Sequence, residues 1–215
     1  MAPRIKFCGL TRLEDATVAV EAGAWALGVI LWPGSARAAT LEQASAIAAA
    51  HRRQVEVCGV FVDATLDDLA AAVDTAGLTM VQLHGSEGPS YCAEVARRTG
   101  AKVIKAARVR GREDLQALQP FHTDFHLLDA HVDGLVGGTG TTWDYELLQG
   151  RRSNVPLILS GGLTAENVAD GIAAVQPFAV DVASGVESAP GIKDHDKVQA
   201  FADAVRASVV SEEVV

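Results

Sequence analysis

Cys8, at the end of the apolar segment RIKFCG, is the first side chain of this sequence that could do acid–base chemistry. A cysteine in such a position is commonly a buried and chemically inert hydrophobe. A second interpretation exists, because a thiolate is a good base and nucleophile when nearby positive charge lowers its pKa. Position alone does not separate the two interpretations, so the surrounding elements must decide between them.

Eight short apolar or β-branched segments alternate with eight amphipathic ones along the chain. The segments expected to form strands are residues 4–9, 25–31, 55–62, 79–85, 102–107, 125–130, 156–162 and 178–185. Thr11, Thr65 and Thr164 each precede a polar residue by three positions, which is typical of helix N-caps. Units repeating about every 27 residues, without a linker, predict a single (β/α)8 TIM barrel domain over residues 1–215. A doubly wound open sheet is the alternative fold.

The composition limits the partners of the chain. With 215 residues, 49% of them hydrophobic, the chain can bury a full core. Its net charge is -9 and no basic run is longer than a pair such as Arg52-Arg53, which excludes nucleic acid and anionic membrane surfaces as expected partners. No apolar stretch reaches the roughly 18 residues of a membrane span, so we expect a cytoplasmic protein.

The spacing of cysteine and histidine residues favours neither a disulfide nor a metal site. The three cysteines are odd in number and far apart, which is typical of reduced thiols. His122 and His126 have a metal-like spacing, but the first lies in a loop and the second on a strand. If Asp129 points into the barrel, strand alternation turns His126 outward. We therefore expect no metal and no cofactor.

Polar side chains collect where the predicted strands end. Barrel enzymes build their active sites from the carboxyl ends of the strands and the loops that follow. In this chain, those positions hold Cys8, His84, Asp129, Asp181 and Ser184. Such a ring of polar groups is what a catalytic rim requires, and it favours the chemical interpretation of Cys8.

Two glycine-containing loops predict a phosphate site. Gly161 and Gly162 follow the seventh strand, and Ser184 and Gly185 follow the eighth. Bare backbone N–H groups offer partial positive charge, so an acidic chain could hold a phosphate without basic side chains. The glycine-rich segment 131–145 fits neither nucleotide-binding pattern, and we expect it to close over a substrate.

Taken in order, these motifs resemble the phosphoribosylanthranilate isomerase family of tryptophan biosynthesis along nearly the whole chain. The resemblance rests on IKFCGLT, QLHG, LLDA followed by GGTGTTWD, LSGGLTAENV and VDVASGVESAPGIKD. The chain departs from the family pattern at Ala36, where a proline is expected, and at Ala183, where a serine is expected. We expect Ala36 to loosen the loop that carries Arg37, and Ser184 with backbone amides to carry more of the phosphate contact.

The resemblance implies an Amadori rearrangement of a phosphorylated aminosugar. Asp129 would be the general acid that opens the sugar ring, Cys8 the general base at sugar carbon 2, and Arg37 the partner of the anthranilate carboxylate. His84 and Asp181 would contact the substrate. An acid active near neutral pH needs a raised pKa and a thiol base a lowered one, so the two sites should differ electrostatically.

Other functions stay open at this point. The related aminoaldose isomerase of histidine biosynthesis would carry an aspartate at the end of the first strand, where this chain has Cys8. A Schiff-base aldolase needs a lysine at a strand end, whereas Lys105 lies within its strand. A phosphate-binding barrel without activity has no use for an acid–base pair. The sequence leaves a monomer and a homodimer equally open.

The alternation of strand one predicts a buried ion pair. If Cys8 faces the interior, Lys6 faces it as well, and barrel closure makes strands one and eight neighbours. Asp181 on strand eight is one of few charges available to meet this lysine. Because buried charges need partners, we expect Lys6 and Asp181 to pair.

Overall fold

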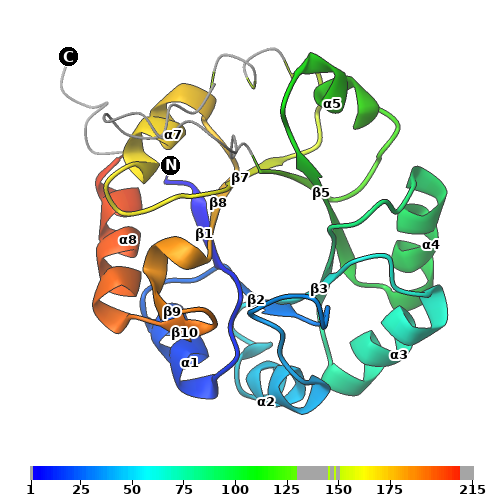
Figure 1. Ribbon diagram of the computed structural model, residues 1–215, viewed down its shortest axis with the longest axis horizontal. Coiled ribbons are helices and arrows are strands. Elements are labelled where there is room, and N and C mark those ends of the chain that lie inside the picture. Colours follow the sequence, from blue (N-terminus) through cyan, green and yellow to red (C-terminus); the bar gives the residue numbers. More distant parts are fainter. Residues whose placement is uncertain (1, 130–144, 146–147, 149–150, 209–215) are drawn as a thin grey trace.

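The computed structural model describes residues 2–129, 145, 148 and 151–208. Eight parallel strands close into a barrel in chain order, as Figure 1 shows in a view along the barrel. The closed sheet confirms the predicted (β/α)8 fold and excludes the open sheet. The strands are β1 (Arg4–Phe7), β2 (Ala26–Ile30), β3 (Glu56–Phe61), β4 (Met80–Leu83), β5 (Lys102–Arg108), β6 (Phe125–Asp129), β7 (Leu157–Ser160) and β8 (Ala179–Val182).

The helices form an outer ring around the barrel (Figure 1). They are α1 (Leu13–Glu21), α2 (Leu41–His51), α3 (Leu66–Ala76), α4 (Pro89–Thr99), α5 (Arg112–Ala117), α7 (Val168–Val175) and α8 (His195–Ala207). Most of the predicted closing segment 131–145, and of the helix expected to follow it, lies outside the described residues. Among the described residues, every helix is too short or too polar to cross a membrane.

The three predicted threonine caps have different outcomes. Thr65 caps α3 as predicted, since its hydroxyl accepts a 3.2 Å hydrogen bond from the backbone N–H three residues on. The prediction for Thr11 is wrong, because its hydroxyl donates to the carbonyl of Gly191 at 2.6 Å and α1 begins later. The prediction for Thr164 is also wrong: the N-cap of α7 is Asn167, whose side chain accepts from the Thr164 backbone N–H at 2.8 Å.

A small hairpin that the sequence analysis did not predict follows the barrel. A short 3-10 turn (Ser184–Val186) leads from β8 into the antiparallel strands β9 (Glu187–Ala189) and β10 (Ile192–Lys193). The hydrogen bond of Thr11 to Gly191 attaches the tip of this hairpin to the loop after β1. The hairpin therefore lies beside the carboxyl ends of the strands, where the site was expected.

The part of the barrel interior near the amino-terminal ends of the strands is apolar and closed. A buried cluster there consists of Cys58, Met80, Ile104, Ala106, Phe125, Leu127, Ile158 and Ala179. Phe125 of this cluster also packs with Trp25 and Phe178, and the three ring centroids lie 5.1 to 5.3 Å apart. The Arg4 guanidinium lies 4.9 Å from the centroid of the Phe178 ring, at the start of β1. This filling leaves the carboxyl-terminal mouth as the open end of the barrel.

The ion pair predicted between Lys6 and Asp181 is confirmed. The two residues are direct partners in the β1–β8 register, and Lys6 Nζ lies 2.6 Å from Asp181 Oδ1. Burial alone would lower the pKa of Lys6, but the charge of Asp181 and its hydrogen bond to the ammonium more than offset burial, and the pKa is raised. Lys6 therefore stays charged inside the barrel, with its counterion held on the neighbouring strand.

Candidate active site

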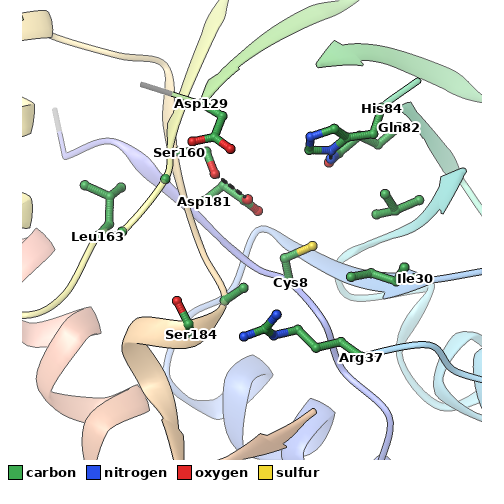
Figure 2. A pocket seen from close by; sticks show the side chains of 14 residues that line it. Cys8, Ile30, Arg37, Gln82, His84, Asp129, Ser160, Leu163, Asp181 and Ser184 are labelled. Carbon is green, nitrogen blue, oxygen red and sulfur yellow. Dashed lines mark hydrogen bonds between the residues drawn. The ribbon is translucent and has the colours of Figure 1, made fainter. Parts of the chain in front are cut away.

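A cavity of about 360 Å³ opens at the carboxyl ends of the strands (Figure 2). Predicted site residues that line it are Cys8, Arg37, His84, Asp129, Gly161, Gly162, Asp181 and Ser184. Lining residues that the sequence analysis missed are Ile30, Val60, Gln82, Ser160 and Leu163. One strand-alternation argument could have found Gln82, because it lies two positions before His84 on the same strand face.

Cys8 is held at the cavity floor by very close packing against β2. Its backbone N–H continues the β1–β8 ladder with a 2.8 Å hydrogen bond to Val182, and only 6% of the residue is exposed. A Cβ at Gly28 would lie 2.7 Å from Cys8 Sγ and 3.1 Å from its Cα. The position of the sulfur therefore depends on glycine at position 28.

The electrostatics of Cys8 differ from the expectation. Burial raises the pKa of the Cys8 thiol, Lys6 lowers it, Asp181 raises it and Lys193 lowers it, and the net result is a raised pKa. The sequence pattern predicts a thiol base whose pKa is lowered by nearby positive charge. Two ammonium groups do supply that charge, but desolvation of a thiolate in the barrel outweighs them. In the free protein, Cys8 is therefore a thiol at neutral pH.

Asp129 is the last residue of β6 and points into the cavity, as Figure 2 shows. Alternation along β6 turns His126 to the outside, as predicted, where its Nε2 lies 2.9 Å from the carbonyl oxygen of Phe121. Its Nδ1 lies 3.1 Å from Arg151 Nη2. His126 thus packs outside the barrel, and Asp129 is the residue of β6 that lines the cavity.

Arg37 is fixed by an ion pair with Glu187. Its Nε lies 2.9 and 3.0 Å from the two carboxylate oxygens, and its Nη2 lies 2.9 Å from Oε2. The Arg37 backbone N–H also donates to the Ser35 hydroxyl at 3.0 Å. Ser35 and Glu187 hold Arg37 in its place in this structure, and the looser loop expected from Ala36 stays a prediction. Glu187 contacts the Nε and Nη2 edge of the guanidinium, so the Nη1 side is turned away from this ion pair.

The hairpin β9–β10 ties Arg37 to the backbone of the cavity floor. Lys193 Nζ lies 3.0 Å from Glu187 Oε1 and donates to the backbone carbonyls of Cys8 at 2.6 Å and Ala183 at 3.1 Å. Burial raises the pKa of Glu187, but hydrogen bonds and charge from Arg37 and Lys193 lower it by more. The net pKa is therefore lowered, and the carboxylate stays ionised. The sequence analysis missed both hairpin charges, although the Pro-Gly turn between them was a signal for a hairpin.

His84 stands at the mouth of the cavity beside Gln82 (Figure 2). The His84 Nδ1 lies 2.9 Å from Gln82 Nε2. Desolvation lowers the pKa of His84, and the nearby charges of Asp129 and Asp181 offset this only in part. His84 is therefore a neutral imidazole at neutral pH, with its Nε2 free to carry the proton when the amide N–H bonds to Nδ1.

The two predicted phosphate loops meet each other at one side of the cavity. Gly161 and Gly162 have φ values of 95° and 62°, which side chains rarely adopt. A Cβ at Gly185 would lie 1.9 Å from the carbonyl oxygen of Leu163, so the turn after β8 packs against the backbone of the loop after β7. Glycine at these positions lets the N–H groups near Ser184 and those of the β7 loop share one side of the cavity.

A closed (β/α)8 barrel with acid–base groups, a fixed arginine and two glycine loops around one mouth defines an enzyme of the TIM-barrel class. The family model described as N-(5'phosphoribosyl)anthranilate (PRA) isomerase matches residues 5–204. The chain therefore belongs to the phosphoribosylanthranilate isomerase family, the isomerases of tryptophan biosynthesis.

Similar proteins agree over nearly the full length. The chain is 47% identical over 198 residues to an N-(5'-phosphoribosyl)anthranilate isomerase of Geobacter sp. strain M21, covering 92% of this chain and 95% of that protein. A phosphoribosyl anthranilate isomerase solved with reduced 1-(o-carboxyphenylamino)-1-deoxyribulose 5-phosphate has a TM-score of 0.84 and 37% identity, covering 95% and 99% of the chains. The monomerised form of the dimeric Thermotoga maritima isomerase has a TM-score of 0.83 and 36% identity, with the same coverages.

Proposed function

We propose that Asp129 and Cys8 perform the acid and base steps by which this isomerase converts N-(5-phosphoribosyl)anthranilate to 1-(2-carboxyphenylamino)-1-deoxyribulose 5-phosphate. The observation that carries the proposal is that these side chains reach one cavity from β6 and from the end of β1. Arg37 and the glycine loops flank the same cavity. A proton donor and a proton acceptor can therefore act on one bound sugar.

The proposed reaction opens the ring before it moves a carbon-bound proton. Asp129 donates its proton to the ring oxygen, the bond from this oxygen to carbon 1 breaks, and the anilino nitrogen lone pair forms an iminium with carbon 1. Cys8 gives up its thiol proton to solvent at the open mouth of the cavity, and the resulting thiolate takes the proton of carbon 2. The electron pair of that C–H bond forms the double bond between carbons 1 and 2, the iminium becomes an enolamine, and tautomerisation gives the ketone.

The raised pKa of Cys8 fits this order of steps. The free protein keeps the thiol protonated because a thiolate is poorly solvated in the barrel. Ring opening creates a cationic iminium next to carbon 2, and an opposite charge within a few ångströms favours the thiolate. Lys6 and Lys193 act in the same direction. The thiolate form of Cys8 is thus favoured at the step in which carbon 2 of the substrate has become acidic.

We propose that the two anionic ends of the substrate have separate anchors. The phosphate binds to backbone N–H groups around Gly161, Gly162, Ser184 and Gly185. The anthranilate carboxylate binds to the Nη1 side of Arg37, which can offer two parallel N–H groups. His84 and Asp181 then face the sugar between the anchors. The dimeric relative supports a homodimer over a monomer for this chain.

Turnover of phosphoribosylanthranilate, followed as loss of anthranilate-type fluorescence, tests the role of Asp129. Asp129→Asn removes the acid, so kcat should fall by roughly 10²- to 10⁴-fold while KM changes little. Asp74→Asn makes the same change on the exposed face of α3 and should leave both constants unchanged. Wild-type kcat in Asp129→Asn would contradict the assignment.

A further inference from the structure

Gln82 in the cavity wall has a buried amide oxygen without a partner. The residue is 2% exposed and lines the active-site cavity from β4. Its Nε2 lies 2.9 Å from His84 Nδ1, whereas its Oε1 accepts no hydrogen bond from the part of the chain that the structure describes. A buried polar group without a partner calls for an explanation.

The neighbours of Gln82 on the barrel wall cannot supply the missing donor. Its direct partners in the strand register are Val60 on β3 and Ile104 on β5, and both side chains are apolar. Met80, two positions earlier on the same face of β4, belongs to the buried cluster beneath. The donor therefore has to come from whatever enters the cavity above.

We propose that Gln82 is a substrate-binding residue whose Oε1 accepts a hydrogen bond from a hydroxyl group of the sugar chain. The inference rests on the proposed placement of the substrate: the phosphate lies at the β7 and β8 loops, on the far side of the eight-strand ring from β4, and the carboxylate lies at Arg37. What faces β4 is then the carbon chain between them, and its hydroxyls are donors.

The hydrogen bond to His84 fixes which end of the amide faces the substrate. With Gln82 Nε2 directed at His84 Nδ1, the oxygen is left to the cavity, and His84 Nε2–H becomes a donor at its mouth. An amide oxygen repels phosphate and carboxylate groups. Gln82 Oε1 therefore accepts a sugar hydroxyl at this wall and repels an anionic end of the substrate. This preference sets the direction in which the substrate binds.

Gln82→Met tests the proposal, because methionine has a similar size and no acceptor oxygen. The probe is reduced 1-(o-carboxyphenylamino)-1-deoxyribulose 5-phosphate, whose binding needs no catalysis. Its Kd should rise about 10-fold. The Kd of inorganic phosphate should not change, and Gln199→Met on the exposed face of α8 should change neither value.

Two results would overturn the inference. An unchanged Kd for the reduced product would show that no substrate group bonds to Gln82. An equal loss of phosphate binding would show general damage to the cavity. Failure of the proposed function has a different signature, which is that the wild-type protein does not bind the reduced product at all.

Discussion

Replacing Lys6 with methionine should destabilise the barrel strongly, because it leaves Asp181 without its counterion. Lys6 is 0% exposed, and its Nζ lies 2.6 Å from Asp181 Oδ1. Removing one partner of a buried pair typically costs 3–5 kcal/mol. Asp181 also lines the cavity and accepts a 3.0 Å hydrogen bond from Ser160, so water and a hydroxyl can stabilise its charge in part. We therefore expect the low end, about 3 kcal/mol.

Urea unfolding measures this loss directly. With a slope of about 2 kcal/mol/M, Lys6→Met should lower the midpoint by about 1.5 M. The double variant Lys6→Met/Asp181→Asn removes both charges, keeps an acceptor for Ser160, and should recover most of the lost free energy of unfolding. A Lys6→Met midpoint within about 0.3 M of the wild type would refute the reasoning, since the pair would then contribute no more than a surface ion pair.

Three further predictions concern the catalytic groups. Arg37→Ala should raise KM about 10- to 100-fold and change kcat less, because the contact forms in ground and transition states alike; a loss confined to kcat in steady-state assays would contradict it. In Asp129→Asn, which lacks that carboxyl group, the residual kcat/KM should rise about tenfold per pH unit below the raised pKa of Cys8, as the thiolate forms; a plateau beginning below neutral pH would contradict it. Gly28→Ala should displace the Cys8 sulfur, lowering kcat and costing about 1–3 kcal/mol in urea unfolding, because the new Cβ would lie 2.7 Å from Sγ; wild-type kcat would show that the sulfur tolerates the shift.

The features that the sequence predicted are those that follow from periodicity. Eight apolar segments separated by amphipathic ones specify a barrel, and barrel closure then specifies which strands are neighbours. The Lys6–Asp181 pair follows from barrel closure, which makes β1 and β8 neighbours, and from strand alternation, which turns Lys6 to the same side as Cys8. The same logic placed His126 outside the barrel on the condition that Asp129 points inside it.

The features that the sequence did not predict depend on contacts between distant segments. Thr11 has the spacing of a helix cap, but the carbonyl of Gly191 reaches it from 180 positions away along the chain. Glu187 holds Arg37 across 150 positions, which no local pattern in the arginine loop could reveal. The direction of the Cys8 pKa shift is a balance between burial and several charges, and composition does not weigh these against one another.

The most direct test of the central claim is the single-turnover rate of Cys8→Ala on phosphoribosylanthranilate, measured with hydrogen and with deuterium at carbon 2. If Cys8 removes that proton, the rate should fall by roughly 10²- to 10⁴-fold, the deuterated substrate should react more slowly still, and affinity for the reduced product should stay close to that of the wild type. A Cys8→Ala enzyme that turns over at nearly the wild-type rate would contradict the account and make Cys8 a packing residue of the barrel.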